Sequence, residues 1–156
     1  MSTLERAIEI AVSAHKGASD KAGAPYVLHP LRVMLSLSGV EEQIVGVLHD
    51  VVEDSDRWTL EALRAEGFSE SIIEALESVT KRPEEEDLPG DDQKVKRDRY
   101  LKFVSRAAKN PIGRKVKLAD LRDNVDLSRI SNLTDKDFAR VAKYWSAIKV
   151  LEKDGL

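Results

Sequence analysis

The chain has 156 residues, which is enough for one domain with its own hydrophobic core. Hydrophobic residues make up 42% of it, charged residues 34% and aromatic residues 5%, and its net charge of -3 gives no overall reason to bind nucleic acid. It has no cysteine, which excludes disulfides, thiolate metal sites and cysteine nucleophiles and favours a reducing, cytoplasmic location. No segment resembles a signal peptide or a membrane span.

The first half of the chain shows helical periodicity in several places. Residues 3–16 follow the cap candidates Ser2 and Thr3, and a second helix is expected over residues 30–37. Between them, residues 17–28 contain two glycines and a proline and predict a loop. A third helix is expected from about residue 41 to 52, because its apolar residues indicate burial on most sides, and Thr59 begins a short fourth.

The second half continues the helical pattern. Helices are expected after the cap Ser69 as far as Val79, and over residues 96–108, 111–125 and 135–151. Residues 81–93 are strongly charged and contain two prolines and a glycine, so they predict a mobile surface loop. No alternating strand pattern and no repeat is present. The prediction is an all-α fold: a single domain over residues 1–156 with about eight helices.

The segment VLHDVVEDSD, residues 47–56, contains the most informative polar side chains. His49 and Glu53 are four residues apart, as are Asp50 and Asp54, so on one helix both pairs occupy adjoining stripes of one face. Burying so much negative charge is unfavourable unless a cation compensates it. The segment therefore predicts a metal site, although a His–Asp pair or an acidic helix end taken alone is more often solvated.

Other candidate ligands lie elsewhere in the chain. His29 supplies a second imidazole, and Asp120, in VKLADLRDNVD, supplies a second carboxylate from another helix. A set of two imidazoles and several carboxylates suits Mn²⁺, Fe²⁺ or Zn²⁺, and its carboxylate content favours manganese.

Three segments together resemble one known family. They are HKGASDKAGAPYVLHPLRV, VLHDVVEDSD and VKLADLRDN, which are similar, in the same order, to the hydrolase domain of RelA/SpoT homologues. The likeness is greatest to small alarmone hydrolases, which are single-domain members of the HD-type phosphohydrolases. It implies an HD-domain helical bundle that removes pyrophosphate from the 3′ position of a nucleotide such as ppGpp, without a synthetase or regulatory domain.

The resemblance also implies roles for individual residues. His29, His49, Asp50 and Asp120 match the family's Mn²⁺ ligands, Glu53 and Asp54 match its catalytic acidic pair, and Asn124 matches a residue that contacts the substrate.

Further candidates for binding a nucleotide are basic or aromatic. Lys21, Arg140 and the basic cluster that begins at Lys94 are candidates for the diphosphates, and Tyr26 matches a pocket-wall residue in the family's PY-x-x-HP pattern. Arg140 and Tyr144 resemble a late Arg and Tyr that enclose the nucleotide. A surface arginine beside a half-buried tyrosine is an equally good interpretation of these two.

One departure from the family bears on the base. Many members have a basic pair where this chain has Asp20 and Lys21, and a carboxylate at Asp20 accepts from an amino group such as adenine N6 but cannot donate to guanine. We therefore expect adenine alarmones such as ppApp to be substrates alongside ppGpp, or in preference to it. A phosphohydrolase of another nucleotide and a non-catalytic nucleotide-binding module are the alternative functions.

Overall fold

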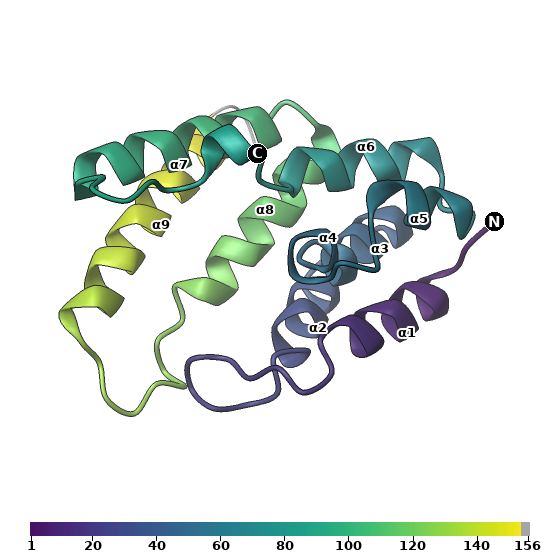
Figure 1. Cartoon of the computed structure of the whole chain (residues 1–156), viewed down its shortest axis with the longest axis horizontal. Coiled ribbons are helices and arrows are strands. Elements are labelled where there is room, and N and C mark those ends of the chain that lie inside the picture. The colour runs from purple at the N-terminus through teal and green to yellow at the C-terminus, as the bar shows by residue number, and fades with distance from the viewer. Residues whose placement is uncertain (154–156) are drawn as a thin grey trace.

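The computed structural model describes residues 1–153, which form helices and connecting loops with no β-strand (Figure 1). In chain order the elements are α1 (Leu4–Ala14), α2 (Leu28–Leu35), α3 (Val40–Leu48), α4 (Val51–Asp54), α5 (Leu60–Ala65), α6 (Glu70–Val79), the 3-10 turn η1 (Pro83–Glu85), α7 (Gln93–Ala107), α8 (Pro111–Asn124) and α9 (Asp135–Lys153). The predicted all-α fold is confirmed. Residues 154–156 of the predicted domain lie outside the described residues.

Side-chain caps set several helix starts where the sequence predicts them. Thr3 accepts from the backbone N–H of Arg6 at the start of α1, and Thr59 and Ser69 cap α5 and α6 in the same way. Asp92 caps α7, which for this reason begins at Gln93 rather than at residue 96. None of the described helices is long and apolar enough to cross a membrane.

The predicted third helix is wrong in one respect, because it breaks between α3 and α4. His49 retains helical dihedral angles, but the backbone of Asp50, with φ -99° and ψ -6°, departs from them. On a regular helix the side chains of neighbouring residues point about 100° apart and do not meet. The break lets His49 and Asp50 converge on one point, so the spacing argument for a single helix face does not hold.

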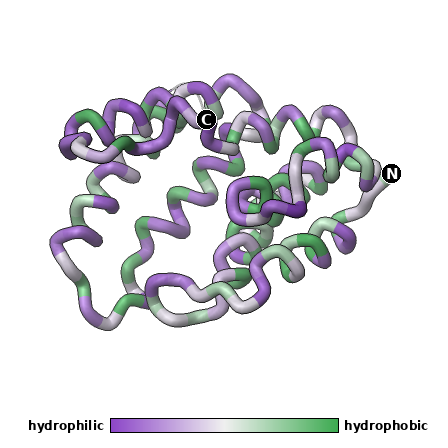
Figure 2. The backbone as a smooth tube through the Cα atoms, viewed as in Figure 1, coloured by the Kyte–Doolittle hydropathy of each residue, from purple (hydrophilic) through white to green (hydrophobic). Residues whose placement is uncertain are grey.

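Two hydrophobic clusters make up the core, and α8 contributes to both. Val116 packs with the larger cluster, which includes residues of α1, α3, α5 and α6, whereas Leu118 and Leu121 pack with residues of α7 and α9. In Figure 1, α8 runs between these two groups of helices, and Figure 2 shows hydrophobic and hydrophilic residues alternating along it. The polar side chains of α8 therefore lie near the boundary between the two clusters.

α8 also packs very closely against α6. A Cβ atom added at Gly113 would lie 2.1 Å from the Ser78 hydroxyl oxygen and 3.2 Å from the carbonyl oxygen of Ala107. Ser78 is buried, and its hydroxyl donates to the carbonyl of Ala75 at 2.7 Å. The absence of a side chain at Gly113 is thus what allows this approach.

The predicted mobile loop at residues 81–93 has more structure than its composition indicates. It contains η1, and Arg106 of α7 holds this turn through two hydrogen bonds to Glu85, of 2.7 and 2.9 Å. Arg99 of α7 also pairs with Asp91. These ion pairs attach the loop to α7, and because they depend on residues distant in sequence, local composition does not predict them.

Candidate metal centre and substrate pocket

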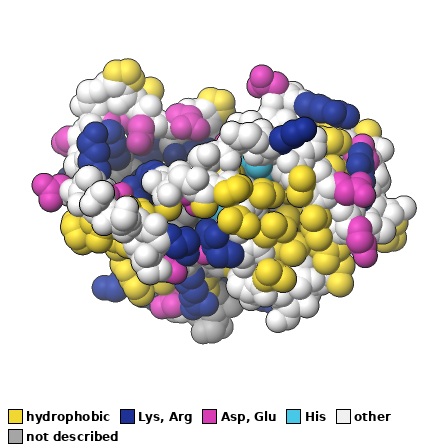
Figure 3. All heavy atoms as spheres, turned by 90° about the horizontal axis from the view of Figure 1, so that it is seen from below, with side chains coloured by type: hydrophobic (Ala, Val, Ile, Leu, Met, Phe, Trp, Pro, Cys, Tyr) yellow, Lys and Arg dark blue, Asp and Glu magenta, His cyan; other side chains and the backbone are white. Residues whose placement is uncertain are grey.

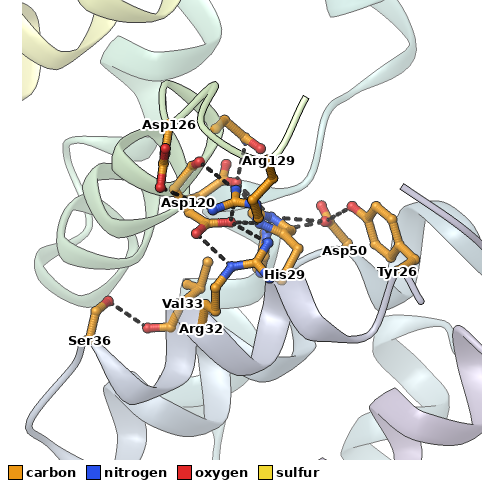
Figure 4. Close-up of polar contacts among 12 residues, drawn as sticks. Tyr26, His29, Arg32, Val33, Ser36, Asp50, Asp120, Asp126 and Arg129 are labelled. Atoms are coloured by element: carbon orange, nitrogen blue, oxygen red, sulfur yellow. Dashed lines mark hydrogen bonds and ion pairs between the residues drawn. The ribbon is translucent and has the colours of Figure 1, made fainter. Parts of the chain in front are cut away.

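Four side chains from three parts of the chain converge on one point, and Figure 4 labels three of them, His29, Asp50 and Asp120. His29 Nε2 and His49 Nε2 are 3.3 Å apart. Asp120 Oδ1 lies 3.0 Å from the first of these nitrogens and 3.4 Å from the second, and Asp50 Oδ2 lies 3.7 and 3.2 Å from them. The structure thus brings together all four residues that the sequence analysis gave as metal ligands.

Both imidazoles are oriented by a hydrogen bond on the side away from this point. His29 Nδ1 donates to Asp123 Oδ2 at 2.7 Å, and His49 Nδ1 donates to the carbonyl of Gly46 at 2.7 Å. Asp123 is held in turn by two hydrogen bonds from Arg32, of 2.8 and 3.1 Å. Such outer hydrogen bonds typically fix the ring orientation of histidines that bind metals.

The two carboxylates of the cluster also have fixed partners. Asp50 accepts a hydrogen bond from the Tyr26 hydroxyl. Asp120 accepts from Asn124 Nδ2 at Oδ1, at 2.8 Å, and from Lys117 Nζ at Oδ2, at 2.9 Å. Lys117, Asp120 and Asn124 share one face of α8, as their spacing of three and four residues requires.

The cluster is electrostatically suited to a positive charge. Burial alone would lower the pKa of His49, but the nearby carboxylates of Asp50 and Asp120 raise it well above its usual value. Burial would likewise raise the pKa of Asp50, but His49 lowers it to about 2. The carboxylates are therefore stabilised in their ionised form by cationic neighbours, and a bound metal ion would serve them in the same way.

This donor set fits a divalent metal ion. His29, His49 and Asp50 each offer a ligand atom within 4.8 Å of the others, and Asp120 Oδ1 is close to both imidazole nitrogens. Each Nδ1–H is used in an outer hydrogen bond, so each imidazole would offer the Nε2 lone pair to a metal ion once the Nε2 proton has been displaced. Two imidazole nitrogens and two carboxylates are a common set for Mn²⁺, Fe²⁺ or Zn²⁺.

The predicted acidic pair is split between two environments. Glu53 lines the pocket beside the cluster, and its Oε1 accepts from the backbone N–H of Lys81 at 2.6 Å. The side chain of Asp54 is 48% exposed, and its Oδ2 lies 3.9 Å from His15 Nδ1. Burial raises the pKa of Glu53, and burial with the charges of Asp50 and Glu53 raises the pKa of Asp54 to about 6.

A pocket of about 540 Å³ opens beside the cluster. Of the predicted substrate-binding residues, Lys21, Tyr26, Asn124, Arg140 and Tyr144 line it. Figure 3 shows histidine side chains at a hollow in the surface, with Lys and Arg gathered on one side of it and hydrophobic side chains on the other. The pocket is therefore open to a ligand and has both charged and apolar walls.

Lys94 lies away from the pocket, whereas Asp20 lies at it. Lys94 is exposed in the first turn of α7 and does not line the pocket. Asp20 lines the pocket, but its Oδ1 accepts from the backbone N–H groups of Ala22 and Ala24, both at 2.9 Å, so it also shapes its own loop.

Several pocket residues were not identified from the sequence. Lys81, Lys117 and Lys143 line the pocket where Lys94 does not, and Asp123 orients His29. For Asp123 a signal was available, because it follows Asp120 by three residues and so lies near it on the same helix. The three lysines come from separate elements and share no spacing that would indicate a common site.

Comparison with known proteins gives the chain's relationships. No family model matches it. It is 34% identical over 131 residues to the guanosine-3′,5′-bis(diphosphate) 3′-pyrophosphohydrolase of Aquifex aeolicus. The matched region covers 78% of this chain and 17% of that protein. It is 33% identical over 130 residues to a GTP pyrophosphokinase of Streptomyces coelicolor, covering 81% of this chain and 15% of that protein.

A shorter match is to a protein of the same name as the first. The guanosine-3′,5′-bis(diphosphate) 3′-pyrophosphohydrolase of Borreliella burgdorferi is 36% identical over 80 residues, which is 49% of this chain and 12% of that protein. The chain thus spans less than a fifth of the length of these relatives. Over 78–81% of its own length, it is a homologue of the RelA/SpoT-type proteins that include the (p)ppGpp 3′-pyrophosphohydrolases.

Proposed function

We propose that this chain is a metal-dependent 3′-pyrophosphohydrolase of purine nucleotide alarmones of the ppGpp type. The observation that carries the proposal is the convergence of His29, His49, Asp50 and Asp120 on one point at the edge of a nucleotide-sized pocket. The names of the relatives include both a hydrolase and a pyrophosphokinase. Two imidazoles and two carboxylates beside a candidate general base favour hydrolysis.

The residues of the chain would divide the work as follows. His29, His49, Asp50 and Asp120 would hold the ion, for which the donor set favours Mn²⁺. When bound, the ion supplies Lewis-acid polarisation of a phosphoryl oxygen and a lowered pKa for water. Glu53, whose Oε1 accepts from the backbone N–H of Lys81, would orient the attacking water and take its proton.

Each turnover would break one bond and form one. The water oxygen bonds to the phosphorus attached to the 3′ oxygen of the nucleotide, and the bond between that phosphorus and the 3′ oxygen breaks. The 3′ oxygen gains a proton and pyrophosphate leaves, so that ppGpp gives GDP. Asp54 is half exposed, and we propose that it passes the proton between this site and solvent.

Asp20 bears on whether the site prefers an adenine or a guanine base. Asp20 uses Oδ1 within its loop, and its other carboxylate oxygen would accept from an adenine amino group. We therefore propose that adenine alarmones such as ppApp are hydrolysed alongside ppGpp or in preference to it. Equal or faster turnover of ppGpp would reject the preference.

The decisive experiment is incubation of the purified protein with Mn²⁺ and a panel of guanine and adenine alarmones. Release of pyrophosphate is expected, and release of orthophosphate from simple nucleotides with inert alarmones would contradict the proposal. Glu53→Gln is expected to lower kcat by about 10²–10⁴-fold with metal binding retained. Asp50→Ala is expected to lose both metal and activity because it removes a ligand.

A matched control for the acidic variant is Glu61→Gln. Glu61 is on α5 with its side chain 83% exposed, and this substitution should leave kcat unchanged. If Glu53→Gln and Glu61→Gln turned over substrate equally well, the role given to Glu53 would be rejected.

A further inference from the structure

Three lysines surround one tyrosine ring in the wall of the pocket. The Nζ atoms of Lys143, Lys117 and Lys81 lie 4.7, 5.6 and 6.0 Å from the ring centroid of Tyr100. All four residues line the pocket, although they come from α9, α8, the loop after α6, and α7. We call this group the lysine wall.

The charges of the lysine wall are only partly neutralised by the protein. Lys117 pairs with Asp120 at 2.9 Å, and Lys81 is 4.0 Å from Glu86. Over residues 1–153, Lys143 has no carboxylate oxygen within the same distance of 4.0 Å. Burial and the charge of Lys81 lower the pKa of Lys143, which reflects the crowding of like charges. An anion in the pocket would relieve that repulsion.

The lysine wall adjoins the metal centre. The Lys117 ammonium donates to Asp120 Oδ2, while Oδ1 of the same carboxylate faces the imidazoles of His29 and His49. The backbone N–H of Lys81 donates to Glu53. A phosphoryl group bound at the metal centre would therefore lie beside the lysine wall. The second phosphoryl group of a diphosphate would then be within reach of the lysine ammonium groups.

The pocket arginines are committed to different partners. Arg32 makes two hydrogen bonds to Asp123, and Arg140 donates to Asp137 at 2.8 Å. Arg129 pairs with Asp126 at 3.1 Å. These arginines have their charges largely compensated, whereas Lys81 has only the 4.0 Å pair with Glu86 and Lys143 has no ion pair within the described residues.

We propose that the lysine wall binds the distal phosphoryl group of the scissile diphosphate and so makes the site selective for diphosphate over monophosphate esters. The inference rests on the proposed function, because it takes the phosphorus under attack to lie at the metal centre. It assigns to Lys81 and Lys143 the binding of the leaving pyrophosphate. Lys117 holds Asp120 and contributes its charge to the same wall.

The test measures binding of two inorganic anions to the Mn²⁺-loaded protein by calorimetric titration. Pyrophosphate reaches both the metal centre and the lysine wall, whereas orthophosphate fills only the metal centre. Lys143→Met and Lys81→Met are each expected to weaken pyrophosphate binding about tenfold, as for one charge-assisted hydrogen bond. Orthophosphate binding should change less than twofold. Lys149→Met, at an exposed position of α9, is the matched control and should change neither.

Unchanged pyrophosphate binding in both variants would overturn the inference. Equal weakening of pyrophosphate and orthophosphate binding would also overturn it, because that result would indicate a general disturbance of the metal centre. Circular dichroism identifies a variant that does not fold, and the other variant then decides. Alarmone hydrolysis by the unaltered protein is measured in parallel. Failure of hydrolysis with the expected binding pattern would reject the proposed function and leave the lysine wall as an anion site. Hydrolysis of the alarmone without the expected difference between pyrophosphate and orthophosphate binding would reject the role of the lysine wall and leave the proposed function standing.

Discussion

Asp123 shows how much of the site depends on a residue that contacts no ligand atom of the cluster directly. It accepts from His29 Nδ1 and is itself fixed by Arg32. An imidazole held in this way has its remaining proton on Nδ1 when it is neutral, with Nε2 aimed at the candidate metal centre. The carboxylate of Asp123 therefore determines both the tautomer and the orientation of His29.

Asp123→Asn is expected to weaken Mn²⁺ binding by about 10–100-fold, because an amide accepts more weakly and loses the ion pair with Arg32. Metal titration of the purified variant measures the change. Asp126→Asn is the control, since Asp126 bonds to Ser128 and Arg129 and touches neither histidine. Equal affinities for Asp123→Asn and the unaltered protein would show that His29 is oriented without Asp123.

At the residue scale, the sequence predicted the convergence of His29, His49, Asp50 and Asp120 because the motifs that contain them are short and recognisable. It did not predict Lys81 or Lys143. Each lies on its own element, and only the packing of α6, with the loop that follows it, and of α9 against α7 brings their ammonium groups to Tyr100. No local pattern contains that information.

At the scale of elements, the caps and the apolar periodicity predicted most helices well, whereas the break at His49 and Asp50 was not predicted. The apolar run of the third predicted helix continues through both residues, so periodicity gives no reason for a break. The break is accompanied by one local bond, from His49 to the carbonyl of Gly46 three residues earlier, and by one tertiary bond, to Asp50 from Tyr26. The sequence likewise gave no sign that Gly113 sets the spacing of α6 and α8.

Gly113→Ala is expected to destabilise the protein by about 1–3 kcal/mol, because the new methyl group overlaps the Ser78 hydroxyl and approaches the Ala107 carbonyl. Denaturant unfolding measures the free energy. The double variant Ser78→Ala with Gly113→Ala removes the closest overlap and should recover part of the loss. Equal stability of the double and single variants would show that the overlap with Ser78 is not the cause.

At the scale of the whole molecule, the candidate metal centre lies where the two hydrophobic clusters meet. α8 packs in both and supplies Asp120, whereas His29 and His49 come from α2 and the turn after α3. A ligand that binds the folded state alone stabilises it by RT ln(1 + [L]/Kd), about 2.7 kcal/mol at a hundredfold excess over Kd. Metal occupancy should therefore change the stability of the entire domain.

Addition of Mn²⁺ to metal-free protein is expected to raise the unfolding temperature by roughly 5–10 °C at that excess. A chelator should reverse the rise. Differential scanning calorimetry measures both, with Asp50→Ala as the control in which the rise should be absent. An equal rise in Asp50→Ala would place the stabilising ion elsewhere.

The meeting of distant segments at this one point has a topological consequence. An ion held by His29 and Asp120 joins positions separated by most of the chain, and closing so long a loop restricts the unfolded state as a covalent bridge does. The sequence contains no cysteine, so no disulfide is open to it. In this protein an ion bound at the candidate metal centre would also cross-link the fold, and loss of the metal would remove that cross-link.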